Sequence, residues 1–160
     1  MKKLGVIVLA AIAAFMLAAC GDDFEYEIAI AQYVEHPSLD ATRQGFLDAL
    51  KDAGLIEGEN LSVDYSNAQA DATNNLSIAQ NIASKEYDLV YAIATPTAQA
   101  IAKAVKNMPV LFAAVTDPLD AGLVDDLEKP GGNVTGASDT NPEAIQRLMD
   151  LDRKSTRLNS

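Results

Sequence analysis

Two residue types that often build catalytic and metal sites are nearly absent from this chain of 160 residues. Cysteine occurs once, at Cys20, and histidine occurs once, at His36. Apart from Cys20 there is no thiol for a disulfide bond, a zinc site or a nucleophile. The sequence also has no cluster with the spacing of metal ligands and no nucleophile elbow. It therefore predicts no metal site, no cofactor and no catalytic residue.

Basic residues are also few. The chain has 12 Lys and Arg residues against 23 Asp and Glu residues, and five of the basic residues lie in the terminal segments 1–19 and 152–160. The part between these segments is strongly acidic. Such a charge repels phosphate backbones and anionic lipid headgroups. We therefore expect no nucleic-acid partner and no basic membrane-binding patch.

The N-terminus has the three parts of an export signal. Two lysines precede an apolar run at residues 4–16, and small residues end this run directly before Cys20. This segment resembles the lipobox of bacterial lipoproteins, in which the peptide before the cysteine is removed and the cysteine is acylated. The resemblance implies a signal peptide at 1–19, a lipidated tether at 20–25 and a lipid anchor in the cell membrane, on its extracytoplasmic side (periplasmic or outer face). An uncleaved N-terminal membrane helix is the alternative, because the apolar run is near the lower limit for a span.

The C-terminal segment 152–160 resembles the in-frame translation of a common sequencing adapter. It shows no apolar period, and its basic residues break the acidic pattern of the preceding sequence. We therefore expect it to be an artefact and expect the native gene to continue beyond Leu151, so that the chain is a fragment. A native basic helix end is the alternative.

Between the two terminal segments, strand and helix patterns alternate with short turns. Strands are expected at 26–33, 60–66, 88–94, 109–115 and 134–138, with helices at 38–54, around 76–83 and at 97–106. We also expect a turn and short helix at 117–127, and Ser38 as the N-cap of the first helix. The alternation predicts an α/β fold, with a doubly wound parallel sheet in one lobe at 26–151.

Short polar side chains follow several of the predicted strands. In doubly wound sheets, ligands bind beyond the carboxyl ends of the strands, where the strand order reverses. Hydroxyl groups such as those of Thr95 and Thr116, together with free N–H groups at a helix N-terminus, suit a carboxylate. Asp117 and Asp139 suit an ammonium group. Alternatively, Asp117 forms a turn before a proline and Asp139 belongs to a hinge.

The loop after the first strand adds three candidate ligand-binding residues, Gln32, Tyr33 and His36. Tyr33 is the one aromatic residue well placed to face a ligand ring. Five other aromatic residues are at positions expected in the core: Tyr26, Phe46, Tyr65, Tyr87 and Phe112. His36 is interpreted either as a residue of the binding cleft or as a solvated turn residue.

Four segments give a more specific indication: 32–40, 92–96, 112–118 and 129–136. Their residues, order and spacing resemble a family of ABC-importer substrate-binding lipoproteins, several of which take aromatic amino acids such as tryptophan or tyrosine. The resemblance covers 27–151. It implies the fold of type I periplasmic binding proteins, with a flavodoxin-like N-terminal lobe present here and the second lobe missing. It also implies that a small-molecule ligand, an amino acid, is delivered to an ABC permease and ATPase, without enzymatic chemistry.

Two other functions remain open at this point. A sensor lipoprotein without a transport role would share the same lobe. An enzyme on a flavodoxin-like sheet is less favoured, because residues 33–37 after the first strand are not a glycine-rich phosphate loop.

Overall fold

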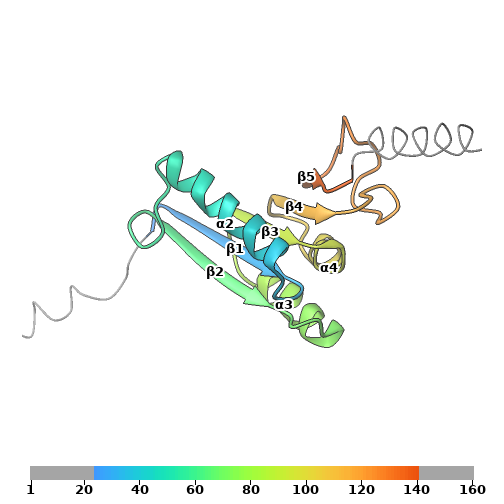
Figure 1. Ribbon diagram of the computed structural model, residues 1–160, viewed down its shortest axis with the longest axis horizontal. Coiled ribbons are helices and arrows are strands. Elements are labelled where there is room, and N and C mark those ends of the chain that lie inside the picture. The colour runs from blue at the N-terminus through green and yellow to red at the C-terminus, as the bar shows by residue number, and fades with distance from the viewer. Residues whose placement is uncertain (1–23, 141–160) are drawn as a thin grey trace, which may run out of the picture.

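The structure, a computed structural model, describes residues 24–140 (Figure 1). The expected signal peptide, Cys20 and the adapter-like tail lie outside the described residues and stay predictions.

The centre of the lobe is a parallel sheet of five strands. They are β1 (Tyr26–Gln32), β2 (Leu61–Asn67), β3 (Leu89–Ile93), β4 (Val110–Val115) and β5 (Val134–Ser138), and their order across the sheet is β2-β1-β3-β4-β5. All five predicted strands are present, within one or two residues of their expected ends. β2 is an edge strand, which agrees with its alternation of apolar and polar residues.

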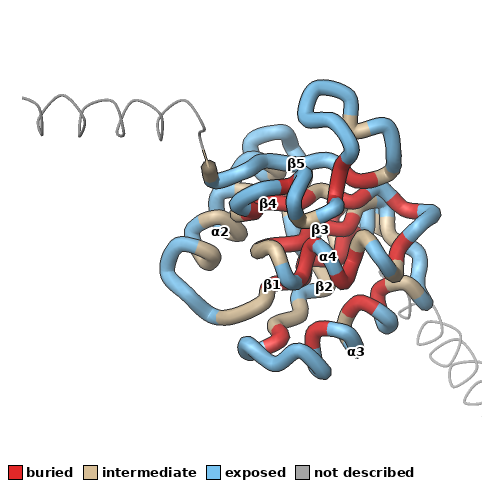
Figure 2. Tube along the Cα trace, turned by 90° about the vertical axis from the view of Figure 1, so that its right-hand side faces the viewer, coloured by how far each residue is buried: buried red, intermediate tan, exposed pale blue. Residues whose placement is uncertain are grey.

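Helices cover both faces of this sheet, as expected for a doubly wound fold (Figure 1). α2 (Pro37–Asp52) packs on one face, and α3 (Ala72–Ala83) and α4 (Thr95–Ala104) pack on the other. Alternate residues of β1 pack on opposite faces of the sheet. Ile28 and Ile30 join the cluster under α2, while Ala29 and Ala31 join the cluster under α3 and α4. Figure 2 shows the resulting concentration of buried residues in the inner strands. The predicted α/β fold is confirmed.

The helix starts differ from the expectation because proline is suited to the first turn of a helix. α2 has Pro37 in its first turn, so the N-cap is His36 and not Ser38. The imidazole Nδ1 of His36 accepts a hydrogen bond from the backbone N–H of Ser38 at 3.3 Å. α4 begins at Thr95, two residues earlier than expected, with Pro96 in its first turn.

The short helix expected within 117–127 is wrong, because the structure has only turns there. Asp117 Oδ1 accepts hydrogen bonds from the N–H groups of Leu119 and Asp120, both at 3.0 Å, and this local bonding competes with a helix. Gly122 then has a φ of 66°, which breaks a right-handed helical path.

Two aromatic residues expected in the core are exposed. Tyr26 begins β1 and Tyr65 lies on edge strand β2, and their side chains are 38% and 39% exposed. Of the other three, Phe112 is buried, and Phe46 and Tyr87 are half-buried. The ring of Phe46 stacks on Tyr91, with 4.0 Å between the ring centroids, and this contact joins α2 to the sheet.

Candidate ligand-binding site

The strand order reverses between β1 and β3. From β1 the chain crosses through α2 to β2 on one side, and it then returns through α3 to β3 on the other side. Gln32 and Ile93, the last residues of these two strands, are direct partners in the parallel register. The loops after them therefore diverge to opposite faces of the sheet. Such a switch point is where doubly wound sheets hold ligands.

The carboxyl edge of the sheet is also where the backbone is strained. Among residues 24–140, the non-glycine residues with positive φ are Gln69, Ala70, Ala94 and Ala114. Gln69 and Ala70 follow β2, and Ala94 follows β3. Ala114 lies near the end of β4, where the β4–β5 register shifts. Ala94, with φ 78° and ψ 150°, occupies a region that is used almost exclusively by glycine. Backbone strain of this kind clusters at functional sites.

The strained Ala94 is the N-cap of α4, and no side chain caps this helix. Pro96 has no N–H group, so Thr95 and Thr97 supply the N–H groups of the first turn that have no intrahelical acceptor. Thr95 is half-buried directly after the strand end. A helix start of this kind attracts a carboxylate, since its N–H groups and dipole both favour negative charge.

A buried pair of polar residues, Asn75 and Thr97, holds this helix start in place, and neither was among the residues predicted from the sequence. Thr97 Oγ1 donates a hydrogen bond to Asn75 Oδ1 at 3.0 Å, and Asn75 Nδ2 donates one to the Pro96 carbonyl at 3.0 Å. The two side chains are 1% and 6% exposed. They join α3 to the first turn of α4 and so fix the position of Thr95. The sequence signal was a polar residue at a core-facing position of each helix.

Gln32, a predicted ligand-binding residue, is fully buried at the switch point. Its Nε2 donates hydrogen bonds to the Val34 carbonyl and to Asp40 Oδ1, both at 2.8 Å. Its Oε1 has no partner within the described part of the chain. These bonds tie the loop after β1 to the first turns of α2, so that Gln32 supports the shape of the loop.

Tyr33, the next residue, is half-buried and connects the loop after β1 to the loop between β2 and α3. Its hydroxyl donates a hydrogen bond to the Ala70 carbonyl at 3.2 Å, and its own carbonyl accepts one from the Ala70 N–H at 2.8 Å. The ring is thereby held beside the β2–α3 loop. His36 is exposed and acts as the α2 cap, with its Nδ1 also 2.8 Å from Ser38 Oγ.

The remaining predicted residues lie further along the same edge, at the ends of β4 and β5, and all three are exposed: Thr116, Asp117 and Asp139. The Thr116 carbonyl accepts a hydrogen bond from Ser138 Oγ at 3.0 Å, and the Asp139 N–H donates to the Val115 carbonyl at 3.1 Å. Asp117 takes the turn-forming role that the sequence left as its alternative. The structure therefore groups Gln32, Tyr33 and Thr95 at the switch point, with the other three beside them along the sheet.

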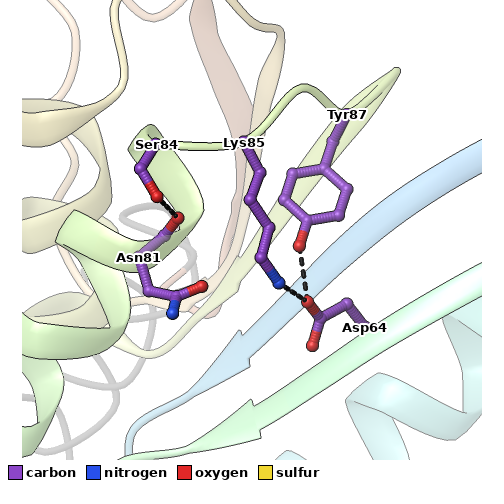
Figure 3. Close-up of polar contacts among 5 residues, drawn as sticks. All are labelled: Asp64, Asn81, Ser84, Lys85 and Tyr87. Carbon is purple, nitrogen blue, oxygen red and sulfur yellow. Dashed lines mark hydrogen bonds and ion pairs between the residues drawn. The ribbon is translucent and has the colours of Figure 1, made fainter.

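A separate polar cluster lies on the α3 side of the edge strand. Figure 3 shows the side chains of Lys85 and Tyr87 pointing toward Asp64. Lys85 Nζ lies 2.8 Å from Asp64 Oδ2, and the Tyr87 hydroxyl donates to the same oxygen. The hydrogen bond from Lys85, then that from Tyr87, lowers the pKa of the Asp64 carboxyl. This cluster ties β2 to the chain between α3 and β3, away from the strand ends.

The described residues contain no group of three or more His, Cys, Asp or Glu side chains arranged to hold a metal ion. Within residues 24–140, no helix combines the length and apolar character needed to cross a membrane.

Comparison with known families gives a match over most of the chain. The family described as "ABC transporter substrate binding protein" matches residues 27–154. A curated relative, the tyrosine-binding protein of Clostridioides difficile (strain R20291), is 54% identical over 112 residues. That alignment covers 70% of this chain and 32% of the relative.

Solved structures agree with this match. A conserved domain protein from Vibrio cholerae has a TM-score of 0.75 and 47% identity, over 81% of this chain and 43% of that one. The ligand-free, open structure of a substrate binding protein with adhesive properties from Clostridium difficile has a TM-score of 0.74 and 49% identity, over 79% and 43%. An ABC domain in complex with L-Trp from Streptococcus pneumonia has a TM-score of 0.70 and 43% identity, over 74% and 40%. The chain thus spans less than half the length of these proteins.

Proposed function

The chain belongs to the ABC transporter substrate-binding protein family, and from this premise we propose that it forms one wall of a site that captures an amino acid, in particular an aromatic one, for an ABC importer. The identity of the ligand is supported by two similar proteins, one named as tyrosine-binding and one solved with L-Trp. The observation that carries the proposal is the uncapped start of α4 at the switch point, where strained Ala94 precedes Thr95.

The chemistry of this edge suits a zwitterion. The carboxylate of the amino acid accepts hydrogen bonds from the hydroxyl groups of Thr95 and Thr116 and from the open N–H groups of α4. Asp117 or Asp139 receives the ammonium group. Tyr33 offers its ring to an aromatic side chain. No step of this capture breaks a covalent bond, so the proposed function is not enzymatic.

A second lobe is part of the proposal. The chain spans 40–43% of the solved chains that it resembles, and the strand ends of one lobe leave a ligand open to water on one side. We place the other wall of the cleft on a second α/β lobe encoded beyond Leu151, with residues 152–160 replaced by native sequence. The permease and ATPase of the importer are the proposed protein partners.

Attachment through Cys20 places this binding lobe beside the importer. Two or three acyl chains hold a protein on a membrane, whereas a single chain binds only marginally. Expression with a labelled fatty acid is expected to label the wild-type protein and not Cys20→Ala. Label that persists in Cys20→Ala contradicts the anchor.

Replacement of the two threonines tests the site. Thr95→Val and Thr116→Val keep the side-chain shape and remove the hydroxyl. In the full-length protein, loss of one buried hydrogen bond to a charged ligand group is expected to weaken binding about ten- to a hundredfold. Calorimetric titration with tryptophan, tyrosine and other small solutes measures this effect.

Lys51→Ala, an exposed change at the far end of α2, is the control and is expected to leave the affinity unchanged. Unchanged affinity in both folded threonine variants contradicts the strand-end site. If no amino acid binds the wild-type protein, the proposed substrate class is wrong.

A further inference from the structure

A polar groove lies on the flank of the lobe, between α2 and edge strand β2, with a volume of about 620 Å³. The side chains that give it its chemistry are Glu35, Asp40, Arg43, Tyr65, Asn67 and Gln69. None of the residues proposed above to contact the ligand lines it. Val63 packs in the cluster under α2, and Tyr65 and Asn67 share its face of β2. The groove is therefore on the α2 side of the sheet, next to the loop after β1.

Arg43 is the only arginine among residues 24–140, and it provides the positive charge of this groove. Its guanidinium carbon lies 4.4 Å from the centre of the Tyr65 ring. Stacking on an aromatic ring uses the flat face of the guanidinium and leaves its N–H edge for a planar acceptor such as a carboxylate. In the described residues no carboxylate forms an ion pair with Arg43, and its Nε is buried without a hydrogen-bond partner.

The wall opposite α2 is held in a fixed shape. Asn67 Nδ2 donates a hydrogen bond to the Tyr65 hydroxyl at 3.1 Å, and Asn67 Oδ1 accepts one from the Gln69 N–H at 2.7 Å. Gln69 and Ala70 follow with φ values of 55° and 59°. Two consecutive non-glycine residues in this conformation are strained, and strain of this kind persists only where the surrounding structure enforces it.

The charges of the groove select the class of ligand. Glu35 and Asp40 bring two carboxylates to the same space as Arg43, so a simple anion is opposed by the acids and a simple cation by the arginine. A zwitterion satisfies both. We propose that this groove is a second, weaker binding site for a free α-amino acid, whose carboxylate binds Arg43 and whose ammonium group binds Glu35 and Asp40. The proposal stands on these residues and does not depend on the strand-end site.

Equilibrium dialysis of the full-length protein with radiolabelled L-tryptophan, up to millimolar concentration, tests the proposal. Two classes of site are expected: a tighter first class at the strand ends and a weaker second class in the groove. Arg43→Gln keeps the stem of the side chain and removes its charge, and it is expected to weaken the second class about tenfold or more while leaving the first class unchanged. Lys51→Gln, the same loss of charge on the same helix, is expected to change neither class. A second class that is absent from the wild type, or unchanged in Arg43→Gln, overturns the proposal.

Two further measurements keep the test independent of whether the variant folds. In the wild-type protein, the Arg43 Nε–Hε resonance and the Tyr65 ring resonances are expected to shift as the second class fills. Tryptamine lacks the carboxylate and indole-3-propionate lacks the ammonium group, so each is expected to bind this class more weakly than tryptophan. Unshifted resonances, or equal binding of either analogue, contradict the proposal. If Arg43→Gln loses the tighter class alone, the weaker site in the groove is refuted, and so is the strand-end location of the tighter site.

Discussion

At the scale of single residues, Ala94 is the most unusual position at the carboxyl edge of the sheet. Its φ of 78° and ψ of 150° cost an alanine about 1–3 kcal/mol, a cost that glycine largely avoids. Ala94→Gly is therefore expected to raise the free energy of unfolding by about 1 kcal/mol, after allowance for the greater entropy of glycine in the unfolded chain. Urea denaturation of the two proteins measures the difference.

The same substitution in an ordinary helical position is the control. Ala41 is exposed inside α2, and Ala41→Gly is expected to lower the free energy of unfolding by about 1 kcal/mol. If both substitutions destabilise the protein equally, Ala94 carries no strain.

The contribution of Asp64 to the stability of the protein is expected to depend on pH. Lys85 and then Tyr87 lower the pKa of this carboxyl through hydrogen bonds. A lowered pKa means that the contribution to stability is present above the ordinary pKa of aspartate and is lost as the pH falls through the pKa of the folded state. Asp64→Asn is expected to be slightly less stable than the wild type at neutral pH, because an exposed pair contributes little.

The pH dependence of that difference identifies its source. Denaturation midpoints are expected to converge as the pH falls below the pKa of Asp64 in the folded state. In the wild type, the pKa values of Tyr87 and Lys85 are raised. The protein is therefore also expected to lose stability at alkaline pH, above the ordinary pKa values of these two groups. A difference that stays constant through the acid range contradicts this assignment.

Some of these residues could be predicted from the sequence and others could not, for physical reasons. Thr95 was predictable because a hydroxyl directly followed an apolar strand at the edge where ligands bind. The strain at Ala94 was hidden, since alanine gives no sign of a positive φ and only the three-dimensional path of the chain imposes it. His36 was missed as a cap because Ser, Thr, Asp and Asn are the usual caps. The ligand roles of the predicted site residues stay predictions.

At the scale of elements, β5 depends on a close approach of its backbone to β4. Gly136 pairs with Phe112, and a Cβ atom at Gly136 would lie 2.1 Å from the Phe112 carbonyl oxygen and 2.6 Å from its ring. Gly136→Ala is expected to lower the free energy of unfolding by about 1–3 kcal/mol, as overpacked sites do. Faster hydrogen exchange of the β5 amides is expected to accompany the loss.

Gly45→Ala provides the matched control. Gly45 lies inside α2, where an added Cβ meets no atom within 4 Å. Alanine is the better helix former there, so this variant is expected to gain about 0.5–1 kcal/mol. If Gly136→Ala is equally benign, the close approach does not determine the pairing of β5.

The elements were easier to predict than the site because each follows from a local pattern. Apolar runs separated by amphipathic helices specify a parallel sheet with little help from long-range contacts. The expectation failed at 117–127, where one Asp side chain and a glycine favoured turns over a helix. The alternation also predicts that the sheet has a switch point, but the place of that point between β1 and β3 comes from the structure. The groove beside Arg43 could not be predicted either, since it depends on side chains from α2 and β2 that are far apart in the chain.

At the scale of the whole molecule, a single lobe leaves the proposed binding site at its strand ends open to water. Small-molecule sites usually bury 70–90% of the ligand surface or more, and the strand ends of one sheet contact a ligand from one side only. The proposed second lobe is therefore expected to supply further contacts and to exclude water from the proposed hydrogen bonds between Thr95 and the ligand. Those hydrogen bonds strengthen as the surroundings become less polar.

The single lobe and the complete protein are therefore expected to differ in affinity. Residues 20–151 alone are expected to bind tryptophan or tyrosine about tenfold or more weakly than the protein that carries the native sequence beyond Leu151. Calorimetric titration of both forms measures the ratio. Thr95→Val is the control for location: it is expected to cost less affinity in the single lobe, where water replaces the lost hydroxyl, than in the complete cleft. Equal affinity of the two forms, or an equal effect of Thr95→Val in both, contradicts a cleft closed by a second lobe.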